Sequence, residues 1–392
     1  MTRTLKILVT GGGTGGHVSP ALATIGAIRQ LAAESLAGSG AWTPEFRYLG
    51  SYGGVEQGLA EAAGVPFTGV QSGKLRRASS VRGLLTFKNF TDALRVPVGI
   101  GQAVTEVRKF WPDVVLATGG YVSVPTVIAA GLLRRPVLIH EQTVQIGLAN
   151  RIAARFASRI ALTFEGAAAE LPPSLRRKSF VSGNPVRPVI FGGDPARAVS
   201  RFGFSAAEDA LPTIYVTGGA QGAQSINRAV EAALPALLTT CRVVHQCGKQ
   251  DGERMAGVRA SLPPALQTRY AAVPFVGDEI GDIFALADLL VGRSGAGTVT
   301  EAAAVGLPAL FIPLVPTGGD EQTRNARRSV DAGAAVILPS GELDGPRLLS
   351  EIRALLSNPA RLTAMGQSAL TLATPNAARE LAEAVLALAG QE

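Results

Sequence analysis

Two glycine-rich loops, each directly after an apolar run, constrain the fold of this 392-residue chain more than any other feature. Residues 9–16 read VTGGGTGG, and residues 216–223, which lie 207 positions further on, read VTGGAQGA. A second pair, DVVLATGG at 113–120 and DLLVGRSG at 288–295, is separated by 175 positions. Each half therefore has a first strand with a glycine loop and a later strand with a small-residue loop. This pattern predicts two Rossmann-like domains of related topology.

The hydrophobic pattern supports an α/β architecture. Continuous apolar runs alternate with Ala/Leu-rich stretches at helical spacing, which is typical of buried parallel strands covered by helices. The predicted strands are residues 7–9, 46–49, 114–117, 137–139, 214–216, 243–245, 289–291 and 310–312. The predicted helices are residues 21–33, 226–238, 299–305 and 377–388, and the last of these suits either half. Gly and Pro crowd residues 182–200, where we expect the seam between the halves.

Composition excludes several classes of protein. Hydrophobic residues make up 47% of the chain and charged residues 17%, which excludes intrinsic disorder and favours two or three globular domains. Two cysteines, Cys241 and Cys247, cannot staple a chain of this length and indicate a reducing cytoplasm. The uncharged window 114–133 is long enough to span a bilayer, but glycines and a proline break it, so we expect no membrane span. The apolar run at 7–9 ends at once in glycines, so we expect no secretory signal. With no CxxC and three scattered histidines, we expect no metal and no cofactor.

The net charge of +7 suits phosphorylated small molecules, nucleic acid or an anionic membrane. Aromatic residues make up only 5%, and no glycine loop is flanked by an aromatic and basic platform, which disfavours nucleic acid. Residues 71–97 interleave basic and apolar side chains, a pattern that fits a solvated basic loop and a contact with anionic lipid about equally well. The candidate membrane contacts there are Leu75, Arg76, Arg77, Arg82, Leu84, Leu85 and Phe87.

The first glycine loop (residues 11–16) fits G-x-G-x-x-G, and its amides could approach an anion at a helix start. A nicotinamide site would need an acid at the end of the next strand, where Gly50 and Ser51 stand instead, so the dehydrogenase class is disfavoured. His17 follows the loop directly. It is either a packing histidine or a general base, and the positive end of a helix favours the neutral imidazole that a base requires.

The second glycine loop (residues 218–223) lacks the lysine and Ser/Thr of a P-loop, so it is not of the Walker type. Beyond it, Thr298 and Glu301 have the spacing of a capping box, although Glu301 could instead accept both hydroxyls of a ribose. Arg293 beside this turn could serve an anionic ligand. Gln322 and Asn325 suit either a polar helix cap or the neutral hydroxyls of a sugar.

The first half also carries polar residues, His140, Glu141 and Gln142, where a predicted strand ends, a position that more often forms a site than a core. No D-x-D triplet occurs, which disfavours a metal-chelated nucleotide-sugar site and leaves phosphate stabilisation by amides and arginine.

Seven motifs in order resemble the MurG family of bacterial N-acetylglucosaminyltransferases. They are GGTGGH at 12–17, GGYV at 119–122, HEQ at 140–142, GNPVR at 183–187, GGAQGA at 218–223, RSGA at 293–296 and EQTRNA at 321–326. The resemblance implies a GT-B fold, in which two Rossmann-like parallel-sheet domains face a cleft. It also implies an acceptor- and membrane-binding domain at 1–183 with the C-terminal helix 375–392, and a UDP-sugar domain at 184–374. The protein would sit peripherally on the cytoplasmic face of the cell membrane.

The same resemblance implies an inverting hexosyltransferase of peptidoglycan synthesis. It would move N-acetylglucosamine from UDP-N-acetylglucosamine to the C4 hydroxyl of the muramoyl sugar of undecaprenyl-linked lipid I, giving lipid II. His17 would be the base, with Tyr121, Glu141 and Gln142 nearby. The implied donor-site residues are Thr14, Gly15, Gly16, Arg187, Ala220, Gln221, Gly222, Val276, Arg293, Ser294, Gly295, Ala296, Gly297, Thr298, Glu301, Gln322 and Asn325.

Three positions depart from the family pattern. Thr143 stands where Asn is usual, Ala220 where Ser is usual, and Gly297 where Leu is common. The alternatives are a related GT-B enzyme, such as a UDP-sugar 2-epimerase or a glycolipid glucosyltransferase, and a non-enzymatic nucleotide-sugar binding protein.

Overall fold

The computed structural model describes residues 3–36, 41–73, 87–205, 211–314 and 320–390. These residues form two compact units. The first takes its residues from 1–187 and 374–392, and the second from 188–316 and 320–373. Within the described ranges, no helix has the length and apolar character needed to cross a bilayer.

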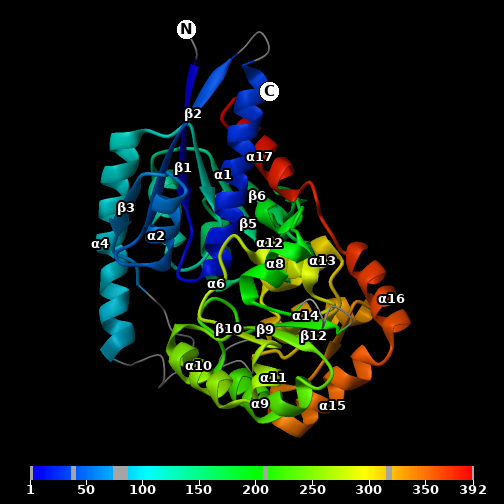
Figure 1. Ribbon diagram of the computed structural model, residues 1–392. Coiled ribbons are helices and arrows are strands. Elements are labelled where there is room, and N and C mark those ends of the chain that lie inside the picture. The colour runs from blue at the N-terminus through cyan, green and yellow to red at the C-terminus, as the bar shows by residue number, and fades with distance from the viewer. Residues whose placement is uncertain (1–2, 37–40, 74–86, 206–210, 315–319, 391–392) are drawn as a thin grey trace. The chain divides into compact units, whose positions relative to one another are not determined.

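The first unit contains a seven-stranded, wholly parallel sheet in the order β3-β2-β1-β4-β5-β6-β7 (Figure 1). Its strands are β1 (Arg3–Thr10), β2 (Trp42–Ser51), β3 (Phe67–Val70), β4 (Val114–Ala117), β5 (Val137–Glu141), β6 (Arg159–Leu162) and β7 (Ser179–Val181). Its helices are α1 (Gly15–Ser35), α2 (Val55–Ala62), α4 (Phe87–Phe110), α5 (Ser123–Leu132), α6 (Leu148–Ala153), α7 (Pro173–Arg176) and α17 (Ala377–Leu388).

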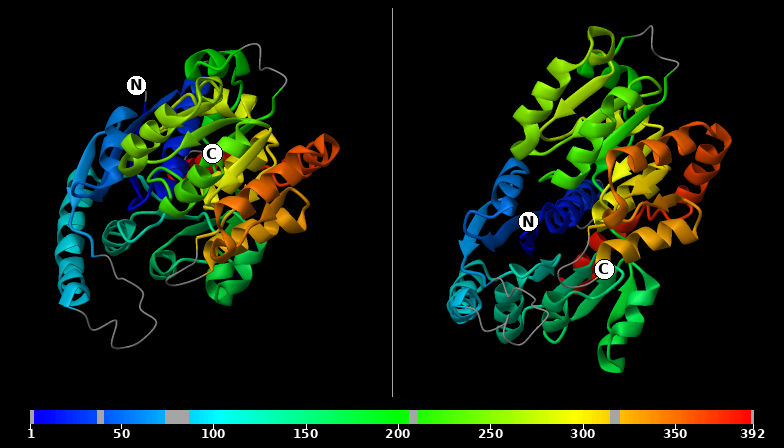
Figure 2. Two further views of the ribbon diagram at one scale, coloured as in Figure 1. Left: turned by 60° about the horizontal axis from the view of Figure 1, so that its bottom comes forward. Right: turned by 90° about the horizontal axis from the view of Figure 1, so that it is seen from below.

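Helices cover both faces of this sheet, because successive side chains of a buried strand point to opposite sides. Leu5, Ile7 and Val9 of β1 pack with α1 and α17 on one face. Leu8 packs on the other face with α4, α5 and α6. Figure 1 shows α17 lying along α1, so a helix from the end of the chain completes the core of the first unit. Helix α4 packs alongside α5, and Figure 2 shows it running along one side of the sheet.

The second unit repeats this design with six parallel strands in the order β10-β9-β8-β11-β12-β13. Its strands are β8 (Thr213–Thr217), β9 (Arg242–Gln246), β10 (Tyr270–Val273), β11 (Leu289–Gly292), β12 (Ala309–Phe311) and β13 (Ala335–Ile337). Its helices are α8 (Pro195–Phe202), α9 (Gln224–Leu237), α10 (Gly252–Ser261), α11 (Pro264–Gln267), α12 (Ile280–Leu286), α13 (Ala296–Val305), α14 (Glu321–Asp331), α15 (Gly345–Leu356) and α16 (Pro359–Leu370).

The predicted repeat has a physical counterpart in two aspartates. The Asp113 carboxylate accepts a 2.8 Å hydrogen bond from the backbone N–H of Lys6, and the Asp288 carboxylate accepts one of the same length from Thr213. Both aspartates precede the strand that pairs with the first strand of their sheet. Each therefore fixes the start of the same strand pair, β1 with β4 and β8 with β11. The predicted pair of related α/β sheets is confirmed.

All eight predicted strands are present, with β12 displaced by one residue from the predicted range. Five strands were not predicted, namely β3, β6, β7, β10 and β13. These strands have only three or four residues, too few for an apolar run to stand out from its surroundings. These five strands are defined by their hydrogen bonds to neighbouring strands and not by an apolar pattern in the sequence.

Candidate functional site

The first glycine loop meets the loop after β4 at the carboxyl edge of the first sheet. The N–H of Gly12 donates to the carbonyl of Gly119 at 3.2 Å. Gly120 has φ +80°, and a Cβ atom added there would lie 2.2 Å from the carbonyl oxygen of Gly12. Glycine at position 120 is therefore a condition for the two loops to touch.

His17 lies in the first turn of α1, where it is half-buried and points back to this junction. Its Nδ1 lies 2.7 Å from Oε1 of Gln142 and 3.2 Å from the carbonyl oxygen of Thr118. The amide nitrogen of Gln142 donates to the same Thr118 carbonyl, which fixes Oε1 as the atom that faces His17. Both neighbours of Nδ1 are acceptors, so neutral His17 carries its proton on Nδ1 and leaves the lone pair on Nε2. This is the tautomer of a general base that acts through Nε2.

Glu141 differs from the expectation that it stands with His17. It is buried at the end of β5, and its two oxygens accept four hydrogen bonds from Thr143 N, Thr143 Oγ1, Gly147 N and Asn150 Nδ2, at 2.9–3.1 Å. Glu141 and Thr143 thus shape the loop that leads into α6. The structure brings Gln142 to His17, whereas the carboxylate of Glu141 is hydrogen-bonded to two backbone N–H groups and to the side chains of Thr143 and Asn150.

Two other residues of the predicted group lie nearby. The His140 ring is fully buried, and burial lowers its pKa to about 4, so it stays neutral and donates from Nε2 to the Gly183 carbonyl at 2.9 Å. The ring of Tyr121 lies over the first glycine loop, because a Cβ at Gly13 would be 2.7 Å from that ring. The predicted end of the strand at 139 was two residues too early, since β5 includes His140 and Glu141.

Two residues that were not predicted support the first glycine loop. Tyr48 donates its hydroxyl to the Gly11 carbonyl at 2.7 Å. Burial first, and then the charge of Glu56, raise the pKa of the Tyr48 phenol, which keeps this donor protonated. Glu56 is fully buried and accepts from the Gly13 N–H at 3.1 Å. The only signal in the sequence was an acid in the first turn of a short amphipathic helix, which is common on surfaces.

In the second unit, the second glycine loop joins β8 to α9. Gly222 has φ +75°, and a Cβ there would lie 2.1 Å from the Cys247 carbonyl oxygen, so this position also needs glycine. Helix α9 has no side-chain cap, while Ala220 and Gln221 are exposed. Uncapped amides at a helix start form a site for an anion.

Arg293 lies at the end of β11 and is buried, and burial lowers its pKa. Its guanidinium donates to the Ile312 carbonyl at 2.8 Å and to the hydroxyls of Ser340 and Ser225 at 2.9 Å. These donors join three protein segments, and the role of Arg293 toward an anionic ligand stays a prediction. No carboxylate is among these acceptors, so the positive charge at the base of the loop is not neutralised by them.

The capping box predicted at Thr298 and Glu301 is wrong. Helix α13 has Gly295 as its N-cap and makes no side-chain cap, so Thr298 lies inside the first turn. A capping box requires Ser or Thr at the N-cap position, and that position is occupied by Gly295, three residues before Thr298. Glu301 is half-buried in α13, and its ribose role stays a prediction.

The start of α14 is fastened to the loop before α13. Ser294 donates its hydroxyl to the Gln322 carbonyl at 2.8 Å, and Asn325 Nδ2 donates to the Ser294 carbonyl at 3.2 Å. Gln322 Oε1 accepts from the Leu314 N–H at 2.9 Å. Buried Asn325 Oδ1 has no hydrogen-bond partner among the described residues, so it keeps an acceptor for a hydroxyl. Val276 is buried in the connection between β10 and α12.

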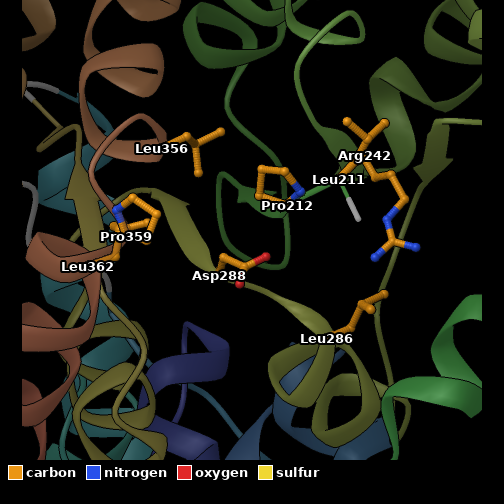
Figure 3. Close-up of a pocket in the computed structure, with 8 residues that line it drawn as sticks. All are labelled: Leu211, Pro212, Arg242, Leu286, Asp288, Leu356, Pro359 and Leu362. Atoms are coloured by element: carbon orange, nitrogen blue, oxygen red, sulfur yellow. The ribbon is translucent and has the colours of Figure 1, made fainter. Parts of the chain in front are cut away.

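Other predicted residues are not described or lie apart. Six of the seven membrane candidates, Leu84 among them, fall in 74–86, outside the described residues, and Phe87 begins α4 without a described side chain. Arg242 and Asp288 are among the residues that line a cavity of about 420 Å³ in the second unit (Figure 3). It lies at the amino ends of β9 and β11, so it faces away from the edge that carries the second glycine loop.

Comparisons with known proteins agree with this geometry. The model of the glycosyltransferase family 28 N-terminal domain matches residues 7–162, and that of the family 28 C-terminal domain matches residues 213–383. A protein of Nocardioides sp. named UDP-N-acetylglucosamine–N-acetylmuramyl-(pentapeptide) pyrophosphoryl-undecaprenol N-acetylglucosamine transferase is 38% identical over 392 residues, covering 98% of each chain. The chain belongs to glycosyltransferase family 28.

Other relatives and solved structures agree with this assignment. A Bacillus anthracis protein with the same transferase name is 36% identical over 357 residues, which cover 90% of this chain and 92% of the relative. The crystal structure of Acinetobacter baumannii MurG matches with a TM-score of 0.69 and 27% identity, over 98% of this chain and 99% of that one. The Neisseria meningitidis UDP-GlcNAc 2-epimerase has a TM-score of 0.63 at 14% identity, a likeness of fold alone. These matches confirm the predicted family and GT-B fold class.

Proposed function

We propose that this family 28 protein transfers N-acetylglucosamine from UDP-N-acetylglucosamine to the C4 hydroxyl of a lipid-linked muramoyl-peptide acceptor, with inversion at the anomeric carbon. The observation that carries the proposal is the locked tautomer of His17, whose Nδ1 lies 2.7 Å from Gln142 Oε1 beside a glycine loop. The names of the Nocardioides and Bacillus relatives support the same donor and acceptor.

In the reaction, Nε2 of His17 accepts the proton of the acceptor C4 hydroxyl while that oxygen attacks the anomeric carbon of the donor sugar. The new C–O bond forms as the bond between the anomeric carbon and the diphosphate breaks, and UDP leaves with the electron pair. Attack from the face opposite UDP inverts the centre and gives a β(1→4) link. The imidazolium that results keeps its Nδ1–H on Gln142, an acceptor already in position.

The second unit supplies the groups that suit the donor. Uncapped amides at the starts of α9 and α13, above the buried Arg293, would hold the diphosphate and stabilise the charge that develops on it. Arg187 would add a further positive charge. Glu301 would accept the ribose hydroxyls, and the backbone at Val276 would meet the uracil. The free acceptor of Asn325, with Gln322 beside it, would face the hydroxyls of the sugar.

The first unit supplies the groups that suit the acceptor. The amides of Thr14, Gly15 and Gly16 at the start of α1 have the character of a phosphate site for the lipid diphosphate. Tyr121 flanks this loop.

We also propose that the amino edge of the first sheet rests on an anionic membrane. Trp111 and Leu132 are 51% and 63% exposed there, and the Arg135 guanidinium lies 5.1 Å from the Trp111 ring centre. Arg134 and Arg155 are exposed in the neighbouring helix-to-strand connections. Basic side chains around exposed apolar ones favour a surface of anionic lipid.

The test is transfer of radiolabelled sugar from UDP-N-acetylglucosamine to a short-chain lipid I analogue, with and without EDTA. We expect β-linked product in both conditions. The H17A variant should lose roughly 100- to 10,000-fold in kcat while binding UDP-N-acetylglucosamine as the wild type does. Absence of product with the wild type contradicts the proposed reaction, and equal loss of donor binding and turnover in H17A contradicts the role of His17 as base.

A further inference from the structure

A buried carboxylate that no step above uses lies under the first glycine loop. Glu56 is in the first turn of α2 and is fully buried. Its Oε1 accepts from the N–H of Ser51 at 2.8 Å and from the Ser51 hydroxyl at 2.6 Å, and its Oε2 accepts from the N–H of Gly13 at 3.1 Å. Across the described ranges no basic side chain forms an ion pair with it. A buried carboxylate held by two backbone N–H groups and one hydroxyl, without a basic partner, is a costly arrangement, so its position calls for a reason.

The space around Glu56 is made by three glycines. A Cβ at Gly12 or at Gly54 would lie 2.5 Å from the carboxyl carbon, and one at Gly50 would lie 2.7 Å from Cγ. The carboxyl group thus touches the end of β2, the start of α2 and the first glycine loop at once. It joins these three segments, and a residue larger than glycine at any of the three positions would not fit beside it.

The same contacts define which amides of the first glycine loop can meet a ligand. The Gly13 N–H already donates to Glu56, so it does not take part in binding an anion. Gly13 also lies against the Tyr121 ring, and the N–H of Gly12 is hydrogen-bonded to the Gly119 carbonyl. Glu56 therefore fixes the half of the loop that precedes the helix and leaves residues 14–16 for phosphate.

The second unit carries a charge of opposite sign near its own glycine loop, at a position of the repeat that differs from that of Glu56. Thr118 and Arg293 occupy equivalent positions of the repeat, 175 residues apart, each at the end of the strand beside the first strand of its sheet. Thr118 donates its hydroxyl to the His17 carbonyl at 2.6 Å, whereas Arg293 places a buried cation under the second glycine loop. The first loop thus has a carboxylate beneath it and the second a guanidinium.

We infer that Glu56 is a positioning residue for the proposed base: it anchors the first glycine loop so that α1 begins where His17 can bond Gln142 and present Nε2. This inference rests on the proposed function for its kinetic part. His17 comes four residues after Gly13, within one turn of the helix that the loop starts, so a displaced Gly13 moves the imidazole.

The variant that tests this is E56Q, which keeps the size of the side chain. An amide has one acceptor oxygen, so either Gly13 or Ser51 loses its partner and faces an NH2 group. We expect amides of residues 11–17 to exchange with deuterium about tenfold faster, and kcat for transfer to fall roughly 100-fold. The dissociation constant of UDP-N-acetylglucosamine, a property of the second unit, should stay within about twofold of wild type.

The matched control is D113N, which removes a carboxylate that also accepts a backbone N–H of β1 but lies at the opposite edge of the sheet. It should lose stability while kcat stays within about twofold of wild type. If E56Q does not fold, E56D takes its place, because a carboxylate one methylene shorter cannot reach both Ser51 and Gly13.

Unchanged exchange at 11–17, or a fall in kcat no larger than in D113N, overturns the inference. A wild type without transfer activity refutes the proposed function and, with it, the kinetic part, whereas the exchange data still decide by themselves if Glu56 anchors the loop.

Discussion

His17 and Gln142 are 125 positions apart in the chain, yet Nδ1 of the histidine lies 2.7 Å from Oε1 of the glutamine. The two residues meet because β1 pairs with β4 and β4 pairs with β5, which brings the starts of α1 and of the loop after β5 to one edge of the sheet. The pair sets the tautomer of His17, and thereby which nitrogen can take a proton.

Replacing Gln142 by Ala removes the nearer of the two acceptors of His17 Nδ1–H and leaves only the Thr118 carbonyl, 3.2 Å away. We expect kcat to fall roughly 10- to 100-fold because the ring loses its fixed orientation, while the donor dissociation constant is unchanged. Nitrogen NMR of the labelled imidazole should report a mixture of tautomers. The control is Q30A, at an exposed position of α1, the helix that carries His17. An unaltered kcat in Q142A contradicts the pairing.

Glu301 is tested by a cycle of protein and ligand changes. Removing its carboxylate in E301A should weaken UDP-N-acetylglucosamine binding roughly tenfold or more, since two hydrogen bonds to a charged acceptor are lost. A donor with 2′-deoxyribose should bind the wild type less tightly than the natural donor does. E301A should bind the two donors equally tightly. The exposed Glu253 on α10 provides the control E253A. Full discrimination between the two donors by E301A argues against ribose binding.

A methyl group at Gly120 should disturb the loop junction. In G120A the Cβ would lie 2.2 Å from the Gly12 carbonyl and the backbone would be strained at φ +80°, so we expect a loss of about 1–3 kcal/mol in the free energy of unfolding and a lower kcat. Gly26, exposed on α1 with no atom within 4 Å of its Cβ position, is the matched control. G26A should be stabilised by up to about 1 kcal/mol. Chemical denaturation of both variants measures the difference.

Two buried histidines predict how stability depends on pH. Burial lowers the pKa values of His140 and His245 from 6.5 to about 4, so the unfolded chain binds more protons than the folded one between these values. Stability should be constant above pH 7 and fall as pH drops from about 6.5 towards 4, by about 2 kcal/mol per histidine at pH 5. Denaturant titrations at pH 7.5, 6 and 5 measure this slope. Equal free energies of unfolding at these three values would rule out buried neutral histidines.

The amino edge of the first sheet is tested with lipid vesicles. Replacing Arg134 and Arg155 by Glu should weaken binding to anionic vesicles, by about 1 kcal/mol for each positive charge removed from the surface. Activity on a short-chain soluble acceptor should persist, because these residues lie away from the glycine loops. Vesicles of neutral lipid provide the control. Unchanged sedimentation with anionic vesicles contradicts the proposed surface.

Much of the site follows from local sequence and some of it does not. The first glycine loop and the location of His17 in the first turn of a helix can be predicted from residues 9–17 alone, because strand, turn and helix signals act over a few neighbours. The same local logic failed at Thr298, whose spacing to Glu301 matches a capping box although the helix begins at Gly295. Local patterns also did not identify Glu56, because the sequence around an acid in a short helix does not show which loop its side chain contacts.

The sequence alone determined that this chain builds two related parallel sheets with glycine loops after their first strands, because buried strands and tight turns demand particular residues in short, repeated patterns. The tertiary structure decided which groups the side chains of the site bind by hydrogen bonds. It gave Gln142 to His17, Glu56 to Gly13 and Arg293 to three backbone and hydroxyl groups. These contacts depend on the order of strands in each sheet, which joins residues tens to more than a hundred positions apart, and no local pattern records that order.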